Sequence, residues 1–114
     1  MAKDDYHVIV YQILSYLYQC LKSGLPIDES KLYYDSKMIN VNKRYWEYII
    51  ASMIDMGLVD GTYCRNLSDG TSEIMSIDKM QITPKGIEYL CDNSFLAKAK
   101  AFVQDTIGVI SPFF

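Results

Sequence analysis

The sequence is poor in the residues that bind metals and form disulfides. It has one histidine, His7, and three widely spaced cysteines, Cys20, Cys64 and Cys91, with no C-x-x-C pair. Structural zinc sites use four Cys or His ligands in closely spaced pairs, so no metal site is expected. An odd number of isolated cysteines is typical of a reducing compartment, where thiols stay free and those in the core pack as small hydrophobes.

The chain also lacks a long apolar run. Gln12, Ser15 and Gln19 interrupt the longest hydrophobic stretch, which therefore falls short of the roughly 20 residues that a bilayer-spanning helix needs. Asp4 and Asp5 occupy the place of the basic segment that begins a secretory signal. We expect a cytoplasmic protein with no membrane contact.

The motifs of common enzyme classes are missing as well. The sequence has no glycine-rich phosphate loop and no nucleophile elbow, and its single histidine belongs to no catalytic motif. The sequence therefore favours a protein that is not an enzyme, uses no cofactor and has no small-molecule ligand.

The chain does have enough apolar residues for one domain. Half of its 114 residues are hydrophobic, and its formal net charge is −3. A chain of this length forms a core without disulfides. We expect a single domain over residues 1–107, followed by a short apolar tail over residues 108–114. Residues 31–45 carry a charge of +3 and the remainder −6, so a basic patch is expected on an acidic body.

Hydrophobic residues at helical spacing predict a first helix over residues 5–23, which Gly24 ends. Its inner stripe consists of Val10, Ile13, Leu14, Leu17 and Leu21. A second, aromatic face carries His7, Tyr11 and Tyr18. Two interpretations stay open. Either the helix is buried on two sides of a small domain, or this face binds a partner, in the simplest case a second copy of the chain.

Two further helices are predicted before residue 57. Asp28 is a good N-cap for a brief helix that ends near residues 35–36. Asn42 caps a third helix over residues 43–56, and Gly57 supplies the left-handed residue that closes it. The inner stripe of this third helix is Trp46, Ile49, Ile50 and Met53.

Beyond residue 57 the apolar period changes from that of a helix to that of strands. Residues 58–64 and 74–82 are rich in β-forming residues and flank a polar loop over residues 65–73, a pattern that predicts a β-hairpin. The alternation in the second strand changes phase, which predicts a bulge or break near Asp78 and Lys79.

Two helices are predicted to complete the domain. Thr83 and Pro84 have the chemistry of an N-cap and a first helical position, and Gly86 predicts close backbone packing. The inner face of this fourth helix is Ile87, Leu90 and Cys91. A last helix over residues 95–107 places in register Phe95, Ala99, Phe102, Val103 and Ile107.

Three helices followed by a hairpin is the order of a winged helix-turn-helix. The run Ile82-Thr83-Pro84-Lys85-Gly86-Ile87-Glu88-Tyr89-Leu90 matches the pattern hydrophobic-Thr-x-x-Gly-x-x-Tyr-Leu that follows the wing in many bacterial winged-helix proteins. With Gly57-Leu58-Val59 after the third helix, nearly the whole chain resembles the YjcQ-like family of small winged-helix proteins, found in Gram-positive bacteria and their prophages. The resemblance implies an α+β, mostly helical fold, a cytoplasmic or phage context and contact with DNA. It carries no catalytic residues.

The third helix is the predicted recognition helix, over residues 42–56. Residues at the start of such a helix face base edges and phosphates, which lysine and arginine suit. Two cations there oppose the helix dipole, which favours a functional reason for them over a merely solvated helix start. We predict a phage-type DNA-binding or transcription-regulatory protein that contacts double-stranded DNA through Lys37, Asn42, Lys43, Arg44, Tyr45, Tyr48 and Arg65.

Other residues point to a different class of function. Glu47 and Asp55 argue against the whole third helix lying in a DNA groove, and the predicted wing sets Arg65 against Asp69 and Glu73. The alternative is a protein-interaction module on the same fold, without DNA binding. It would form a homodimer or bind another protein through His7, Tyr11, Tyr18, Phe113 and Phe114.

Overall fold

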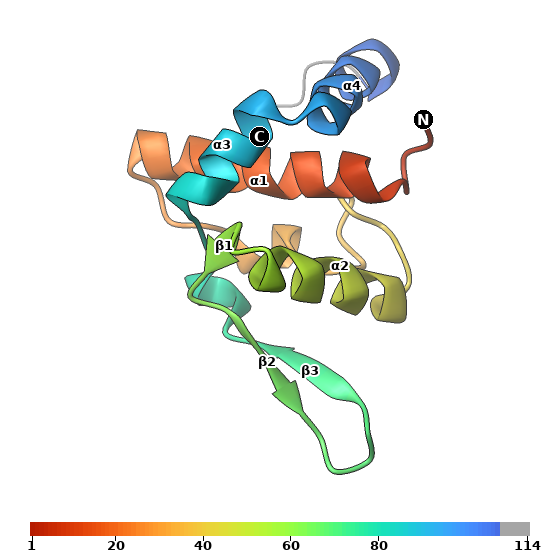
Figure 1. Ribbon diagram of the computed structural model, residues 1–114, viewed down its shortest axis with the longest axis vertical. Helices are drawn as coiled ribbons and strands as arrows, with labels where there is room; N and C mark the ends of the chain where they lie inside the picture. The colour runs from red at the N-terminus through yellow and green to blue at the C-terminus, as the bar shows by residue number, and fades with distance from the viewer. Residues whose placement is uncertain (108–114) are drawn as a thin grey trace.

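The computed structural model describes residues 1–107. α1 (Tyr6–Ser23) lies between a layer of α2 and the strands on one side and a layer of α3 and α4 on the other (Figure 1). The chain is α+β and mostly helical, as the sequence predicts. The remaining elements are η1 (Glu29–Lys31), α2 (Lys43–Asp55), β1 (Val59–Asp60), β2 (Tyr63–Asn66), β3 (Ser72–Met75), η2 (Ile77–Lys79), β4 (Gln81–Ile82), α3 (Pro84–Asp92), α4 (Ser94–Phe102) and η3 (Val103–Ile107). The predicted tail, with Phe113 and Phe114, lies outside the described residues.

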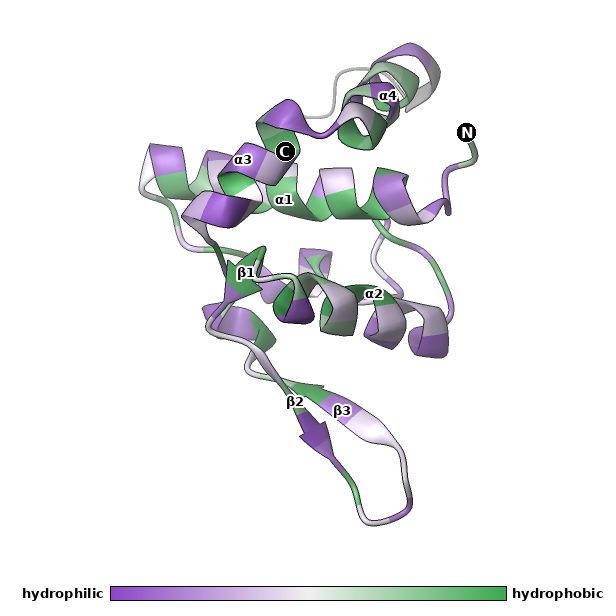
Figure 2. Cartoon of the chain, viewed as in Figure 1, coloured by the Kyte–Doolittle hydropathy of each residue, from purple (hydrophilic) through white to green (hydrophobic). Residues whose placement is uncertain are grey.

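α1 is buried on two sides, as the first of the two interpretations predicts, whereas partner binding by its aromatic face stays a prediction. Val8, Ile9 and Val10 are consecutive and fully buried, and successive helical residues point about 100° apart, so one covering layer cannot bury all three. Figure 2 shows hydrophobic residues along α1 and hydrophilic residues on the hairpin and at the start of α2. Gly24 ends the helix in the left-handed conformation, as predicted. The prediction for Leu21 is wrong: it is 55% exposed, in the last turn beyond the packed layers.

The predicted second helix is wrong in length. Asp28 caps as expected, accepting from the Ser30 amide at 3.1 Å, but the helix is the three-residue 3-10 turn η1. The following residues include two tyrosines, an aspartate and a serine, all of weak helix propensity. Tertiary contacts hold them as turns instead, because Leu32 and Ile39 are buried and the Trp46 indole N–H donates to the Leu32 carbonyl at 2.8 Å.

α2 begins and ends where the sequence places its caps. The Asn42 side chain accepts from the Tyr45 amide at 2.9 Å. At the other end Gly57 is left-handed, and the Leu58 amide donates to the Met53 carbonyl at 2.9 Å. This is the Schellman closure that the glycine predicts. The inner stripe of α2 is buried as predicted, which turns the opposite side of the helix outward.

The strands form two antiparallel pairs, β1 with β4 and β2 with β3. η2 separates β3 from β4, which confirms the predicted break, and Ser76 before it adopts a positive φ of 60°. The break lets Ile77, Met80 and Ile82 all reach the core. The predicted loop is too long, because residues 65–66 and 72–73 pair as the ends of β2 and β3.

Two helices complete the described domain, as predicted, with corrections to their inner faces. Thr83 caps α3, accepting from the Gly86 amide at 3.0 Å, but Cys91 is exposed. Asn93 caps α4 by accepting from the amides of Phe95 and Leu96. This start buries Leu96, Ala99 and Val103 and leaves Phe95 exposed, contrary to the predicted register. The predicted last helix also changes character at Val103, where the π-helical turn η3 begins.

Gly86 provides a test of this packing, because a Cβ at this position would meet the Leu58 carbonyl oxygen and the Ile82 side chain. Gly86→Ala should destabilise the protein by about 2–3 kcal/mol, although alanine is the better helix former by about 1 kcal/mol. Urea denaturation of the full chain measures the change. Gly24→Ala is the control, since it adds a Cβ in open space at a positive φ and should lose only about 1 kcal/mol. An equal or smaller loss for Gly86→Ala would contradict the close approach.

Candidate functional site

The first turn of α2 presents cations to solvent. Lys43 and Arg44 are exposed, and Lys37 is exposed in the segment before the helix. Within residues 1–107, neither Lys43 nor Arg44 forms an ion pair with a carboxylate. The turn is held rigidly from behind by the Asn42 cap and by Trp46, which is buried and hydrogen bonded to Leu32. Of the predicted basic residues, Lys43 and Arg44 therefore share the first turn of α2, whereas Lys37 lies in the segment before it and Arg65 on β2.

The two predicted tyrosines of α2 lie in different environments. Tyr45 is half-buried, and its hydroxyl donates to the Asp4 carbonyl oxygen at 2.8 Å. Burial raises the pKa of Tyr45, and the nearby Asp4 and Asp5 raise it further. Tyr45 thus links the N-terminal segment to α2, whereas Tyr48 is 67% exposed. Of the two, Tyr48 has the side chain that a partner can reach.

Arg65 has a carboxylate partner on the hairpin. It lies opposite Glu73 in the pairing of β2 and β3, and the Arg65 guanidinium is 2.6 Å from the Glu73 carboxylate. Both side chains are about half exposed. Glu73 therefore offsets the charge of Arg65, the hairpin residue that was predicted to contact DNA.

The rest of α2 is acidic on the side that approaches the hairpin. Burial raises the pKa of the Cys64 thiol on β2, and the carboxylates of Asp55 and Glu47 raise it further. The negative charges of Asp55 and Glu47 therefore reach the thiol of Cys64 on the hairpin. α2 thus carries exposed cations in its first turn and carboxylates beyond it.

An aromatic row runs from α4 across α1 to α2. Phe95 stacks on His7 with ring centroids 4.8 Å apart, His7 meets Tyr6 edge-on at 5.1 Å, and Tyr6 meets Tyr48 at 6.5 Å. Phe95 is 51% exposed and His7 half-buried. His7, which was predicted to face a partner, lies in this row between Phe95 and Tyr6, and its contact with a partner stays a prediction. Tyr6 and Phe95 were not predicted as interface residues, because the predicted register placed Phe95 on the inner face of the last helix and no motif marked Tyr6.

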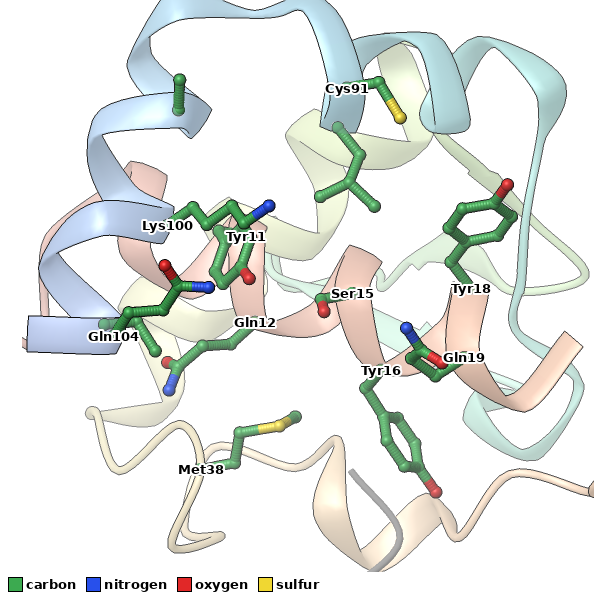
Figure 3. A pocket seen from close by; sticks show the side chains of 13 residues that line it. Tyr11, Gln12, Ser15, Tyr16, Tyr18, Gln19, Met38, Cys91, Lys100 and Gln104 are labelled. Atoms are coloured by element: carbon green, nitrogen blue, oxygen red, sulfur yellow. The ribbon is translucent and has the colours of Figure 1, made fainter. Parts of the chain in front are cut away.

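Tyr11 and Tyr18, the other aromatic residues of the predicted face, lie elsewhere. They line a groove of about 580 Å³ between α1, α3 and α4 (Figure 3). The groove residues that were not predicted to be functional include Gln12, Ser15, Gln19, Lys100 and Gln104. One signal was present in the sequence: the three α1 residues among them are the polar interruptions of its apolar run, spaced along one side of the helix.

Within residues 1–107, no helix has the length and apolarity needed to span a membrane. The same residues contain no cluster of histidine, cysteine and acidic side chains that could hold a metal ion. The family model described as YjcQ protein matches residues 11–105 of the chain. No curated protein and no solved structure matches it.

The acidic side of α2 can be tested through Cys64. Removing its two carboxylates with Glu47→Gln and Asp55→Asn should lower the pKa of Cys64 and so increase its thiolate fraction at pH 8. Alkylation of Cys64 by iodoacetamide should accelerate about two- to threefold, measured by mass spectrometry of the Cys64 peptide. Cys91, exposed on α3, is the internal reference and should react at an unchanged rate. An unchanged rate at Cys64 would mean that these acids do not act on the hairpin.

Proposed function

The chain belongs to the YjcQ family, and we propose that it is a winged-helix DNA-binding protein of a regulatory type. α1, the turn at η1, α2 and the hairpin of β2 and β3 follow the order of a winged helix-turn-helix, with the second helix shortened to one turn. In this arrangement α2 is the recognition helix and the hairpin is the wing. The observation that carries the proposal is the pair Lys43 and Arg44, exposed on a rigid helix start without carboxylate partners among the described residues.

The chemistry of this turn suits a local contact with duplex DNA. The Arg44 guanidinium can address a guanine edge or a phosphate with two parallel hydrogen bonds, and Lys43 and Lys37 can neutralise phosphates. Glu47 and Asp55 would repel the backbone farther along α2. The contact is therefore end-on, made by the first turn of the helix, and involves about two or three phosphates.

This geometry predicts the salt dependence of binding. With about two or three phosphates neutralised, the logarithm of the association constant should fall with log salt at a slope of about −2 to −3. The double variant Lys43→Glu with Arg44→Glu should abolish the affinity while leaving stability within about 0.5 kcal/mol, as expected for exposed positions. Fluorescence anisotropy with a labelled duplex measures the salt slope and the loss of affinity, and urea denaturation measures the stability of the variant.

The control for this variant is Lys98→Glu with Lys100→Glu. It makes the same change in net charge on α4, which lies on the other side of α1 from α2 (Figure 1). The control should keep most of its affinity. Equal losses in the two double variants would show that net charge alone governs binding, and binding that survives the α2 variant would refute α2 as the contact.

The aromatic row supports a second candidate function, a protein-interaction module that pairs with a second copy of the chain. Phe95 and Tyr48 expose about half or more of their surface, and aromatic residues are enriched at the centres of protein interfaces. Because the row crosses three helices, it presents a preformed surface rather than a flexible segment.

Sedimentation analysis of the full chain at high concentration distinguishes this candidate. The expected result is a dimer that dissociates when Phe95 and Tyr48 are both replaced by serine. Tyr63→Ser is the matched control, since Tyr63 is 52% exposed on β2 and lies outside the row. A monomer at every concentration, or a dimer that the Phe95 and Tyr48 changes leave intact, would exclude self-association through the row.

A further inference from the structure

The groove between α1, α3 and α4 has the dimensions of a small-molecule site. Its volume is about 580 Å³, within the roughly 300–1,000 Å³ of typical ligand pockets. A second hollow, beside Leu21 and Leu25, measures only about 240 Å³. None of the described residues that line the larger groove belongs to α2, although Met38, next to Lys37, is one of them.

The groove contains polar groups without protein partners. Gln12 is only 7% exposed, yet its side-chain amide makes no hydrogen bond with any of residues 1–107. The side chains of Ser15, Gln19 and Gln104 likewise make none with the described residues. Among the described residues, no buried side-chain nitrogen or oxygen atom lacks a hydrogen-bond partner, so the polar atoms of these four side chains are accessible from the groove. They are available to form hydrogen bonds with a molecule bound there.

The charge and shape of the lining define the partner's chemistry. Lys100 is the one charged residue among the described lining residues, which include no acid. Figure 3 shows its side chain extending from α4 toward the α1 side of the groove. The rings of Tyr11 and Tyr18, with Leu90 and Val103, supply flat and apolar walls. Such a lining offers stacking and burial to a ring, hydrogen bonds from amides, and one cation for an acid group.

We propose that this groove binds a small aromatic anion, with its ring between α1 and α3 and its carboxylate or sulfonate at Lys100. The lone ammonium in an otherwise uncharged site on an acidic protein selects for one negative charge. The amides of Gln12 and Gln104 complete the hydrogen bonding of the acid or of polar ring substituents. This proposal departs from the sequence analysis, which favoured no small-molecule ligand.

The probe for the test is 8-anilinonaphthalene-1-sulfonate, and its uncharged counterpart is N-phenyl-1-naphthylamine. The full chain should bind one molecule of the sulfonate, measured by calorimetry and by fluorescence. Lys100→Met should weaken sulfonate binding about tenfold, as expected for the loss of one charge-assisted hydrogen bond, and should leave binding of the uncharged probe unchanged. Lys98→Met, on the same helix but outside the groove, is the control and should change neither.

A variant that fills the groove tests whether the probes bind in it rather than elsewhere on the protein. Ala97 lines the groove and is exposed on α4, so Ala97→Trp should keep the fold, as checked by circular dichroism, and abolish binding of both probes. Absence of sulfonate binding to the full chain, or binding that Ala97→Trp leaves intact, would overturn the proposal. So would binding only after removal of residues 108–114, because the groove would then be the seat of the chain's own apolar tail.

Discussion

α1 packs against a layer of other elements on each of two sides along most of its length, and this constraint organises the molecule. Its consecutive buried residues Val8, Ile9 and Val10 require a layer on each side. α2 and the β1–β4 pair supply one layer, while α3 and α4 supply the other (Figure 1). The chain must therefore continue past the hairpin and return to the far side of α1. Where the second layer leaves a gap, the helix exposes its polar interruptions, and the groove forms there.

The same constraint decides which surface of α2 is free. Trp46, Ile49, Ile50 and Met53 are buried, so the residues between them must face outward. Along the exposed side of α2, charge changes sign from Lys43 and Arg44 in the first turn to Asp55 in the last. The dipole of α2 disfavours cations at its start by some tenths of a kcal/mol each. Packing does not require those cations, because neither is buried, so a role on the surface is the simpler explanation for them.

Local chemistry could be predicted from the sequence wherever neighbouring residues determine it. Asn42, Gly57 and Thr83 act as caps because each needs only the few residues beside it. The turn at η1 could not be predicted in this way. It depends on the indole N–H of Trp46, 14 residues later, which donates a hydrogen bond to the Leu32 carbonyl oxygen. The register of α4 was missed because Asn93 caps two amides and shifts the buried face from Phe95 to Leu96. The groove was missed for a longer-range reason, since its walls come from residues as far apart as Tyr11 and Gln104.

Some of the surfaces on which the functional proposals rest lie within the residues that the family model matches, and others lie partly outside them. The match spans residues 11–105, which contain the whole of α2 and every described residue that lines the groove. Tyr6 and His7, which join the two ends of the aromatic row, precede it. A property common to the family must reside in the matched residues, so the first turn of α2 and the groove are better placed to be shared features than the aromatic row. Self-association through the row, by the same argument, would be a feature of this chain and its nearer relatives.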